Sequence, residues 1–230
     1  MKKAFINWSG GKDASMALWM LRREGKIRVD RLLTSMNSGQ DRISMHGVRR
    51  SLLERQAAAI GLSLHTVELP DMPDMPAYEH AMQQKLEAFR EEGLETAVFG
   101  DIFLEDLRQY REAKLAALQM EALFPLWKLD TRQLLERFIT AGFRAIVVCT
   151  QDSSLPASFC GRELDAAFLR DLPAGVDPCG EHGEFHSFVY DGPLFKEALA
   201  FERGTTVQRW YKDPVGDAEM GFHYCDLLPG

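Results

Sequence analysis

The sequence lacks the paired cysteines that ribbon-type zinc sites and iron–sulfur clusters use. Its four cysteines are scattered, and no two of them form a C-x-x-C pair: Cys149, Cys160, Cys179 and Cys225. In a chain of 230 residues, such thiols are more typical of a reducing compartment than of a disulfide scaffold. No apolar run approaches the ~18 residues of a membrane helix, and the N-terminus turns polar too early for a signal peptide. These absences predict a cytoplasmic protein with no membrane partner.

The chain also lacks the positive net charge of a broad nucleic-acid-binding surface. It has 27 basic and 34 acidic residues, a net charge of −7, which argues against nucleic acid as the partner. Residues 1–55 nevertheless hold 12 basic and 5 acidic side chains and carry +7. A basic first quarter in an acidic chain favours a local anionic ligand such as phosphate. Solvated basic helix faces are the alternative interpretation.

Strand-like and helix-like segments alternate along the first half of the chain. The expected strands cover residues 4–8, 29–36, 62–69 and 96–102, and the expected helices cover residues 14–24, 48–60, 78–92 and 105–123. This alternation predicts a doubly wound α/β domain over residues 1–127, with a parallel sheet covered on both faces.

The second half of the chain has a different pattern of expected helices and strands. We expect a helix that begins at Asp130 or Thr131, a strand at residues 145–149 and a helix at residues 161–172. Strands at residues 186–190, 205–211 and 222–228 then alternate with glycine-rich turns. Residues 128–230 are therefore predicted to form a smaller α+β domain.

A glycine-containing loop separates the first expected strand from the first expected helix. It reads Ser9-Gly10-Gly11-Lys12-Asp13-Ala14-Ser15. Two glycines let backbone amides approach a ligand closely, and the N-terminus of the following helix attracts anions. The two serine hydroxyls and the lysine ammonium add further donors. The segment is neither the G-x-x-x-x-G-K-[ST] loop nor the G-x-G-x-x-G turn of dinucleotide folds, so it predicts a phosphate site of another type.

The loop resembles the S-G-G-x-D-S signature of the PP-loop ATP pyrophosphatases, with Ala14 in place of the last serine. Two further stretches narrow the resemblance. One is Phe99-Gly100-Asp101-Ile102, which leads to Pro125-Leu126-Trp127, and the other is Cys179-Gly180-Glu181-His182-Gly183-Glu184-Phe185-His186-Ser187-Phe188-Val189. In this order the three motifs are similar to those of the diphthine–ammonia ligase family of diphthamide synthases. His182 stands where that family usually has asparagine.

The resemblance implies a Rossmann-like domain of the adenine nucleotide α-hydrolase type and a smaller family-specific domain. It also implies an AMP-forming ligase that uses ATP, Mg²⁺ and ammonia to convert a carboxylate into an amide. The phosphates would be bound by Ser9, Gly10, Gly11, Lys12, Asp13 and Ser15. Thr34 and Met36 would lie against the adenine, and Asp13 would hold the magnesium ion. Asp101, at the carboxyl end of an expected strand, would hold magnesium or orient the substrate.

The second motif has three interpretations on its own chemistry. Glu181 and Glu184, with His186, can serve acid–base catalysis around ammonia. Cys179, His182 and His186 have a spacing that zinc can use, although no fourth ligand is evident. The third interpretation is a structural turn whose polar groups are satisfied by the backbone.

Each pair of basic residues outside the loop has two possible roles. His46, with Arg49 three residues later, either faces the phosphates or lies at a solvated helix end. Arg108 and Arg111 either bind a substrate carboxylate or pair with neighbouring acidic residues on a helix surface.

The sequence thus favours an ATP-dependent amide-forming ligase that adenylates a carboxylate of a small molecule or a protein side chain. The alternatives are a PP-loop RNA-modifying enzyme and a non-catalytic nucleotide-binding module. A homodimer is the expected assembly, from general frequency alone.

Overall fold

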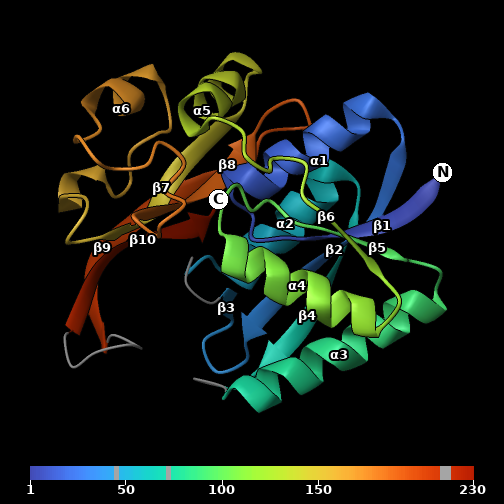
Figure 1. Ribbon diagram of the computed structural model, residues 1–230. Coiled ribbons are helices and arrows are strands. Elements are labelled where there is room, and N and C mark those ends of the chain that lie inside the picture. Colours follow the sequence, from blue (N-terminus) through green and yellow to red (C-terminus); the bar gives the residue numbers. More distant parts are fainter. Residues whose placement is uncertain (44–46, 71–73, 213–218) are drawn as a thin grey trace.

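The computed structural model describes residues 1–43, 47–70, 74–212 and 219–230, and in these ranges the chain forms two sheets (Figure 1). The first half of the chain has an α/β architecture, as predicted, and its sheet is parallel except for one short strand. Its parallel strands are β1 (Lys2–Asn7), β2 (Ile27–Asn37), β4 (Ser63–Leu69), β5 (Thr96–Val98) and β6 (Glu121–Leu123), in the order β4-β2-β1-β5-β6. The short β3 (Arg42–Ile43) pairs antiparallel with the end of β2.

Helices cover both faces of this sheet, which is the doubly wound arrangement. The helices α1 (Lys12–Glu24) and α2 (Arg50–Ile60) pack on one face. The helices α3 (Met75–Glu91) and α4 (Glu105–Ala117) pack on the other face, over a separate apolar cluster. The crossovers that follow β1 and β5 therefore leave toward opposite faces, and the carboxyl ends of these two neighbouring strands form a topological switch point.

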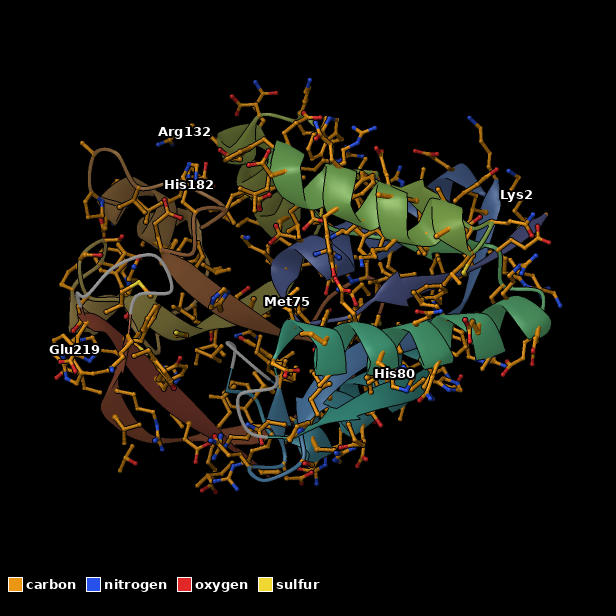
Figure 2. All side chains as sticks on the ribbon, turned by 60° about the horizontal axis from the view of Figure 1, so that its bottom comes forward. Lys2, Met75, His80, Arg132, His182 and Glu219 are labelled. Atoms are coloured by element: carbon orange, nitrogen blue, oxygen red, sulfur yellow. The ribbon has the colours of Figure 1, made fainter. Side chains whose placement is uncertain are left out.

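The second sheet is antiparallel. It contains β7 (Arg144–Gln151), β8 (Phe185–Asp191), β9 (Phe201–Lys212) and β10 (Glu219–Pro229), in the order β8-β7-β10-β9. The helices α5 (Thr131–Thr140) and α6 (Ala166–Asp171) and the short η1 (Ala157–Phe159) accompany it. Figure 2 shows Lys2 of β1 and Glu219 of β10 at opposite ends of the molecule. One buried cluster runs from α1 into β7 and β8, so the two sheets share a core. The division of the chain at residue 127 remains a proposal.

Two predicted helices are wrong in extent. The helix expected to reach residue 123 ends at Ala117, because Gln119 adopts a positive φ of 56° and the next residues form β6. The helix expected at residues 161–172 covers only Ala166–Asp171. Its first residues bond to β7 instead, through Gly161 N to Val147 O and Leu164 N to Ala145 O. No helix of the described residues is both long and apolar enough to span a bilayer.

Candidate active site

A cavity of about 300 Å³ lies at the switch point of the first sheet, where the second sheet closes over it. The carboxyl ends of parallel strands are where open α/β sheets bind ligands. The cavity is lined from three parts of the chain: Asn7, Ser9, Gly11, Lys12, Asp13 and Ala14; then Gly100, Asp101 and Arg111; then Cys179, Gly180, Glu181, Gly183, Phe185, His186 and Ser187. The fold thus brings the predicted loop, Asp101 and the second motif together.

The loop presents the N-terminus of α1 to this cavity. Gly11 is the N-cap residue with extended backbone angles and has no capping side chain of its own, while the N–H of Lys12 donates to Ser187 Oγ at 3.2 Å. The other amides of that turn and the positive end of the helix dipole face an anion that enters the cavity. Gly10 has a φ of +76°, in the left-handed region that glycine adopts at little cost. Gly10 lies behind the cavity rather than on its wall.

Lys12 and Asp13 form an ion pair at the mouth of the loop, with the lysine side chain buried and the aspartate side chain 29% exposed. The Lys12 ammonium lies 2.8 and 2.7 Å from the two Asp13 carboxylate oxygens. Burial opposes the charge on Lys12, but Asp13 and the nearby acidic groups outweigh it and hold the lysine pKa above its ordinary value. Burial also raises the pKa of Asp13, and Lys12 opposes that shift. The pair supplies one cation and one carboxylate at the anion site.

Asp101 lies beside this pair because Gly100 lets β5 approach α1 closely. A Cβ atom on Gly100 would lie 2.9 Å from the backbone N of Ala14 and 2.9 Å from the backbone C of Asp13. The Asp101 carboxylate contacts Arg111, with Oδ2 lying 3.1 Å from Nε. Burial raises the Asp101 pKa, Arg111 lowers it, and the charge of Asp13 raises it further. The two aspartates therefore share one electrostatic environment.

These two aspartates fit a magnesium ion that arrives with phosphates. Asp101 Oδ2 lies 3.1 Å from Arg111 Nε without hydrogen-bond geometry, so it keeps lone pairs with which a cation could be bound. Among the described residues, no group of three or more His, Cys, Asp and Glu side chains could hold a metal ion by itself. Mg²⁺ typically takes one or two carboxylates together with substrate phosphates and waters, which is what Asp13 and Asp101 offer.

Glu181 is the titratable group best placed for acid–base chemistry in the second motif. Its Oε1 accepts hydrogen bonds from the backbone N of Ile102, at 2.7 Å, and of Phe103, at 3.3 Å. Burial raises its pKa to about 7; the two amides oppose this shift, and Asp13 adds to it. A carboxyl with a pKa near neutrality can give and take a proton under physiological conditions.

Glu184 has a structural role instead, contrary to the catalytic prediction. Its side chain is buried, and its two oxygens accept hydrogen bonds from the backbone N of Asp177 and of His182, both at 3.0 Å. It does not line the cavity. The structural interpretation of the motif therefore holds for this residue.

His186 does line the cavity, in the neutral form. Burial, with a contribution from Lys12, lowers its pKa to about 4, so the ring carries no charge near pH 7. The zinc interpretation fails in the described structure, because His182 is exposed and packs against Phe103. Cys179 is buried, which raises the pKa of its thiol, and its Sγ donates to Thr131 O, so the thiol form is favoured over the nucleophilic thiolate.

Three predicted ligands among the described residues, Ser15, Thr34 and Met36, do not reach the cavity. The hydroxyl of buried Ser15 donates to Gly11 O at 2.9 Å, as a serine one helical turn later commonly does. The hydroxyl of Thr34 donates to Trp8 O, and the Met36 side chain is fully buried in the core. His46 lies outside the described residues. Of the two arginines, Arg108 pairs with Glu112 and stacks on Trp127, while Arg111 lines the cavity.

The polar residue that joins the two sheets behind the loop is Gln56. Its amide accepts from Trp8 Nε1 at 2.7 Å and donates to Gly10 O at 3.0 Å and Val189 O at 2.6 Å. The Val189 N–H also donates to Gly10 O, at 2.9 Å. A fully buried amide with all these partners fixes the loop against β8.

Replacing Gln56 by leucine should destabilise the protein. The change leaves the Trp8 N–H and the Val189 carbonyl without their buried partners, and each such loss costs about 1–3 kcal/mol. We expect a fall in melting temperature of about 4–24 °C, measured by thermal unfolding. Gln109→Leu, at an exposed position of α4, is the control and should change little. Equal melting temperatures of the two variants would contradict the role given to Gln56.

Sequence comparisons agree with these features. The chain matches the family descriptions "Diphthamide synthase N-terminal domain" over residues 1–117 and "Diphthamide synthase C-terminal domain" over residues 130–216. A zebrafish (Danio rerio) protein named diphthine–ammonia ligase is 33% identical over 132 residues, which are 55% of this chain and 52% of the relative. A mouse (Mus musculus) protein of the same name is 26% identical over 220 residues, 86% of this chain and 82% of the relative. The matches thus span about half of the zebrafish relative and most of the mouse relative.

Proposed function

Because the chain belongs to the diphthamide synthase family, we propose that it is an ATP-dependent ligase that converts a carboxylate into an amide with ammonia. The observation that carries the proposal is the convergence of Lys12, Asp13 and Glu181 on one cavity. An anion site, a pair of aspartates and a carboxyl that titrates near neutrality are the groups that this chemistry requires.

In the first step, an oxygen of the acceptor carboxylate attacks the α-phosphorus of ATP. The bond from that phosphorus to the bridging oxygen breaks, and pyrophosphate leaves. The amides of α1 and the Lys12 ammonium stabilise the negative charge on the leaving pyrophosphate. Asp13 and Asp101 would hold the magnesium ion, which when bound supplies further charge neutralisation.

In the second step, ammonia attacks the acyl carbon of the adenylate, and AMP leaves with the electron pair of the broken C–O bond. The attacking nitrogen must lose a proton. We assign that proton to the ionised Glu181 carboxylate, since its pKa of about 7 matches a general base at neutral pH. Neutral His186 lines the cavity as a hydrogen-bonding group and adds no charge there.

Product analysis with α-labelled ATP, Mg²⁺, ammonium and fractionated cell extract tests the proposal. We expect AMP and pyrophosphate, dependent on one fraction that contains the acceptor. ADP as the product would contradict the proposal. Bound ATP without any product would favour the non-catalytic nucleotide-binding module. A cytoplasmic location and a homodimer stay predictions from the sequence.

The rate of amide formation should depend on pH through Glu181. At a fixed concentration of free ammonia, and with the ionised form as the base, the rate falls about tenfold per pH unit below pH 7 and levels off above it, following its pKa of about 7. Glu181→Gln should remove this dependence and lower the plateau rate about 10²-fold or more. Glu105→Gln, at an exposed position on α4, is the matched control. An unchanged profile in Glu181→Gln would assign the proton transfer elsewhere.

A further inference from the structure

The second sheet contributes a hydroxyl to the wall of the active-site cavity. Ser187 of β8 is buried, with 3% of its surface exposed, and it lines the cavity beside the first turn of α1. Its Oγ accepts a hydrogen bond from the backbone N of Lys12, at 3.2 Å. A serine hydroxyl has two lone pairs and one O–H donor, so this contact leaves the donor of Ser187 unused.

That donor has no acceptor in hydrogen-bond geometry among the residues that the structure describes. A buried donor without an acceptor is unfavourable, and an oxygen atom of a ligand in the cavity would satisfy it. The bond that Oγ accepts from Lys12 also polarises the hydroxyl, which makes its O–H a better donor. The geometry thus keeps one strong donor for a ligand.

The loop itself lacks a hydroxyl at the corresponding place. Ala14 stands where the S-G-G-x-D-S signature has its last serine, and it lines the same cavity with a methyl group. Ser15 does not replace that serine, because its hydroxyl donates to Gly11 O. The first turn of α1 therefore offers backbone amides to the cavity and no hydroxyl, while the hydroxyl of β8 lies against that turn.

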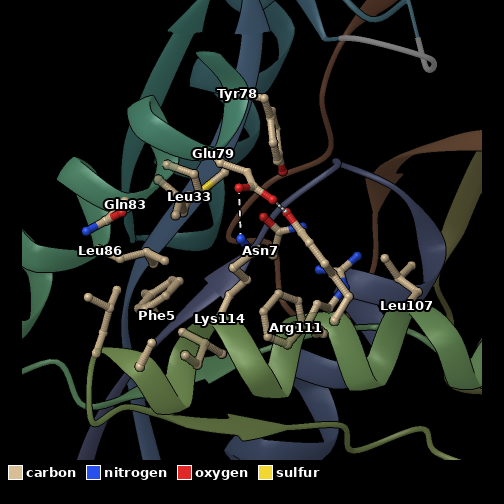
Figure 3. A pocket seen from close by; sticks show the side chains of 16 residues that line it. Phe5, Asn7, Leu33, Tyr78, Glu79, Gln83, Leu86, Leu107, Arg111 and Lys114 are labelled. Atoms are coloured by element: carbon tan, nitrogen blue, oxygen red, sulfur yellow. Dashed lines mark hydrogen bonds and ion pairs between the residues drawn. The ribbon is translucent and has the colours of Figure 1, made fainter. Parts of the chain in front are cut away.

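The cations of the cavity wall are already paired. The Lys12 ammonium contacts both oxygens of Asp13, and Arg111 contacts Asp101. Arg111 also lines a second cavity, of about 320 Å³, between α3 and α4 on the opposite face of the first sheet (Figure 3). Each cation thus divides its donors between an aspartate and any ligand, whereas Ser187 has its single donor free for one.

We propose that Ser187 is a phosphate ligand of the ligase, whose O–H donates to an oxygen of the leaving pyrophosphate and takes the place of the hydroxyl missing at position 14. The inference rests on the proposed function. Val189 N also donates to Gly10 O, so β8 lies along the loop and the second sheet completes the phosphate site of the first.

The kinetic consequence follows from the growth of charge during the first step. Negative charge on the pyrophosphate increases as the bond to the α-phosphorus breaks, so the hydrogen bond from Ser187 strengthens toward the transition state. Ser187→Ala should therefore lower kcat for AMP formation about tenfold or more, with a smaller rise in KM for ATP. A rise in KM alone would overturn the assignment to the leaving group.

Calorimetric titration of the full chain with inorganic pyrophosphate and Mg²⁺ tests the contact without any ATP chemistry. We expect Ser187→Ala to weaken pyrophosphate binding about tenfold or more, because hydrogen bonds to charged oxygens are the stronger ones. Ser51→Ala, at an exposed position of α2, is the matched control and should bind like the unaltered chain. Equal affinity in Ser187→Ala, or no binding by the unaltered chain, overturns the inference.

A second substitution separates the donor from its structural role. Ser187→Ala also removes the acceptor of the Lys12 N–H, and a disturbed loop would itself bind pyrophosphate less well. Ala14→Ser returns a hydroxyl to the cavity wall without returning that acceptor, so Ser187→Ala combined with Ala14→Ser should bind within about threefold of the unaltered chain. A double variant as weak as Ser187→Ala would show that Ser187 only supports the loop.

The titration also keeps this inference distinct from the proposed function. A chain that binds pyrophosphate through Ser187 and forms no AMP contradicts the ligase activity and retains the phosphate contact. A chain that forms AMP and binds pyrophosphate equally well without the Ser187 hydroxyl retains the activity and overturns the contact. Thermal unfolding verifies that each variant is folded before it is titrated.

Discussion

Replacing Lys12 by methionine is expected to lower the rate of AMP formation about 10³-fold. The ammonium is the one cation buried in the phosphate loop, at the N-terminus of α1. A preorganised charge in a site closed from water stabilises the developing pyrophosphate far more than an exposed charge would, and losing one such donor typically costs about 10²–10³ in rate. Steady-state release of AMP from labelled ATP measures the effect.

Controls separate chemistry from folding in this experiment. Lys12→Met alone leaves the partly buried Asp13 carboxylate without its partner, which destabilises the fold. The double variant Lys12→Met with Asp13→Asn removes both charges and nearly preserves volume, so it should fold and still lack activity. Lys26→Met changes an exposed lysine just beyond α1 and should be fully active. AMP release at the normal rate from a folded Lys12 variant would show that the loop assignment is wrong.

Gly100→Ala should impair stability and activity together. The new Cβ atom would meet the backbone of Asp13 and Ala14 at 2.9 Å, and backbone cannot move aside as a flexible side chain can. Overpacking of this kind costs about 1–3 kcal/mol, or a fall of about 2–12 °C in melting temperature. Because the first turn of α1 must shift, we expect AMP formation to fall about 10²-fold.

A second glycine gives the comparison for that experiment. A Cβ atom on Gly204 of β9 would have its nearest neighbour at 3.3 Å. Position 204 does not line the active-site cavity. Gly204→Ala should therefore keep its activity. Full activity in Gly100→Ala would mean that the approach of β5 to α1 has no part in catalysis.

The sequence predicted the fold well where glycine and apolar spacing agree. Gly25 and Gly61 end α1 and α2 in the left-handed conformation, at the positions where the pattern placed the helix ends. The failures come from competition that a local pattern does not contain. β6 has three residues and depends on pairing with β5, and Gly161 bonds to β7 instead of starting a helix.

The site was predictable in part, because some of its residues stand at expected strand ends or on a recognisable face of an element. The loop residues Lys12 and Asp13 and the acidic Asp101 stand at strand ends, where chemistry is expected, and the structure places them on one cavity. Ser187 could have been found, since the alternation of a strand puts it on the same face as Phe185. The single polar residue on the apolar face of α2, Gln56, was a comparable signal.

Other residues could not be placed from spacing alone. Ser15 is next to the loop, yet its hydroxyl bonds to its own helix, and Glu184 bonds to its own turn. Local backbone groups competed with the ligand for both side chains. The shared position of Arg111 between two cavities depends on the packing of α4 against the sheet, which only the three-dimensional structure reveals.

The contact between the loop and β8 also has a consequence during synthesis. The backbone N of Lys12 bonds to Ser187 Oγ across 175 residues of chain, and Gly10 O bonds to Val189 N. A ribosome must therefore release residue 189 before the loop can adopt its final shape, and contacts of such long sequence separation form slowly. The loop is made well before β8 and becomes competent only after it, so a translation product truncated before residue 187 would carry the loop without the ability to use it.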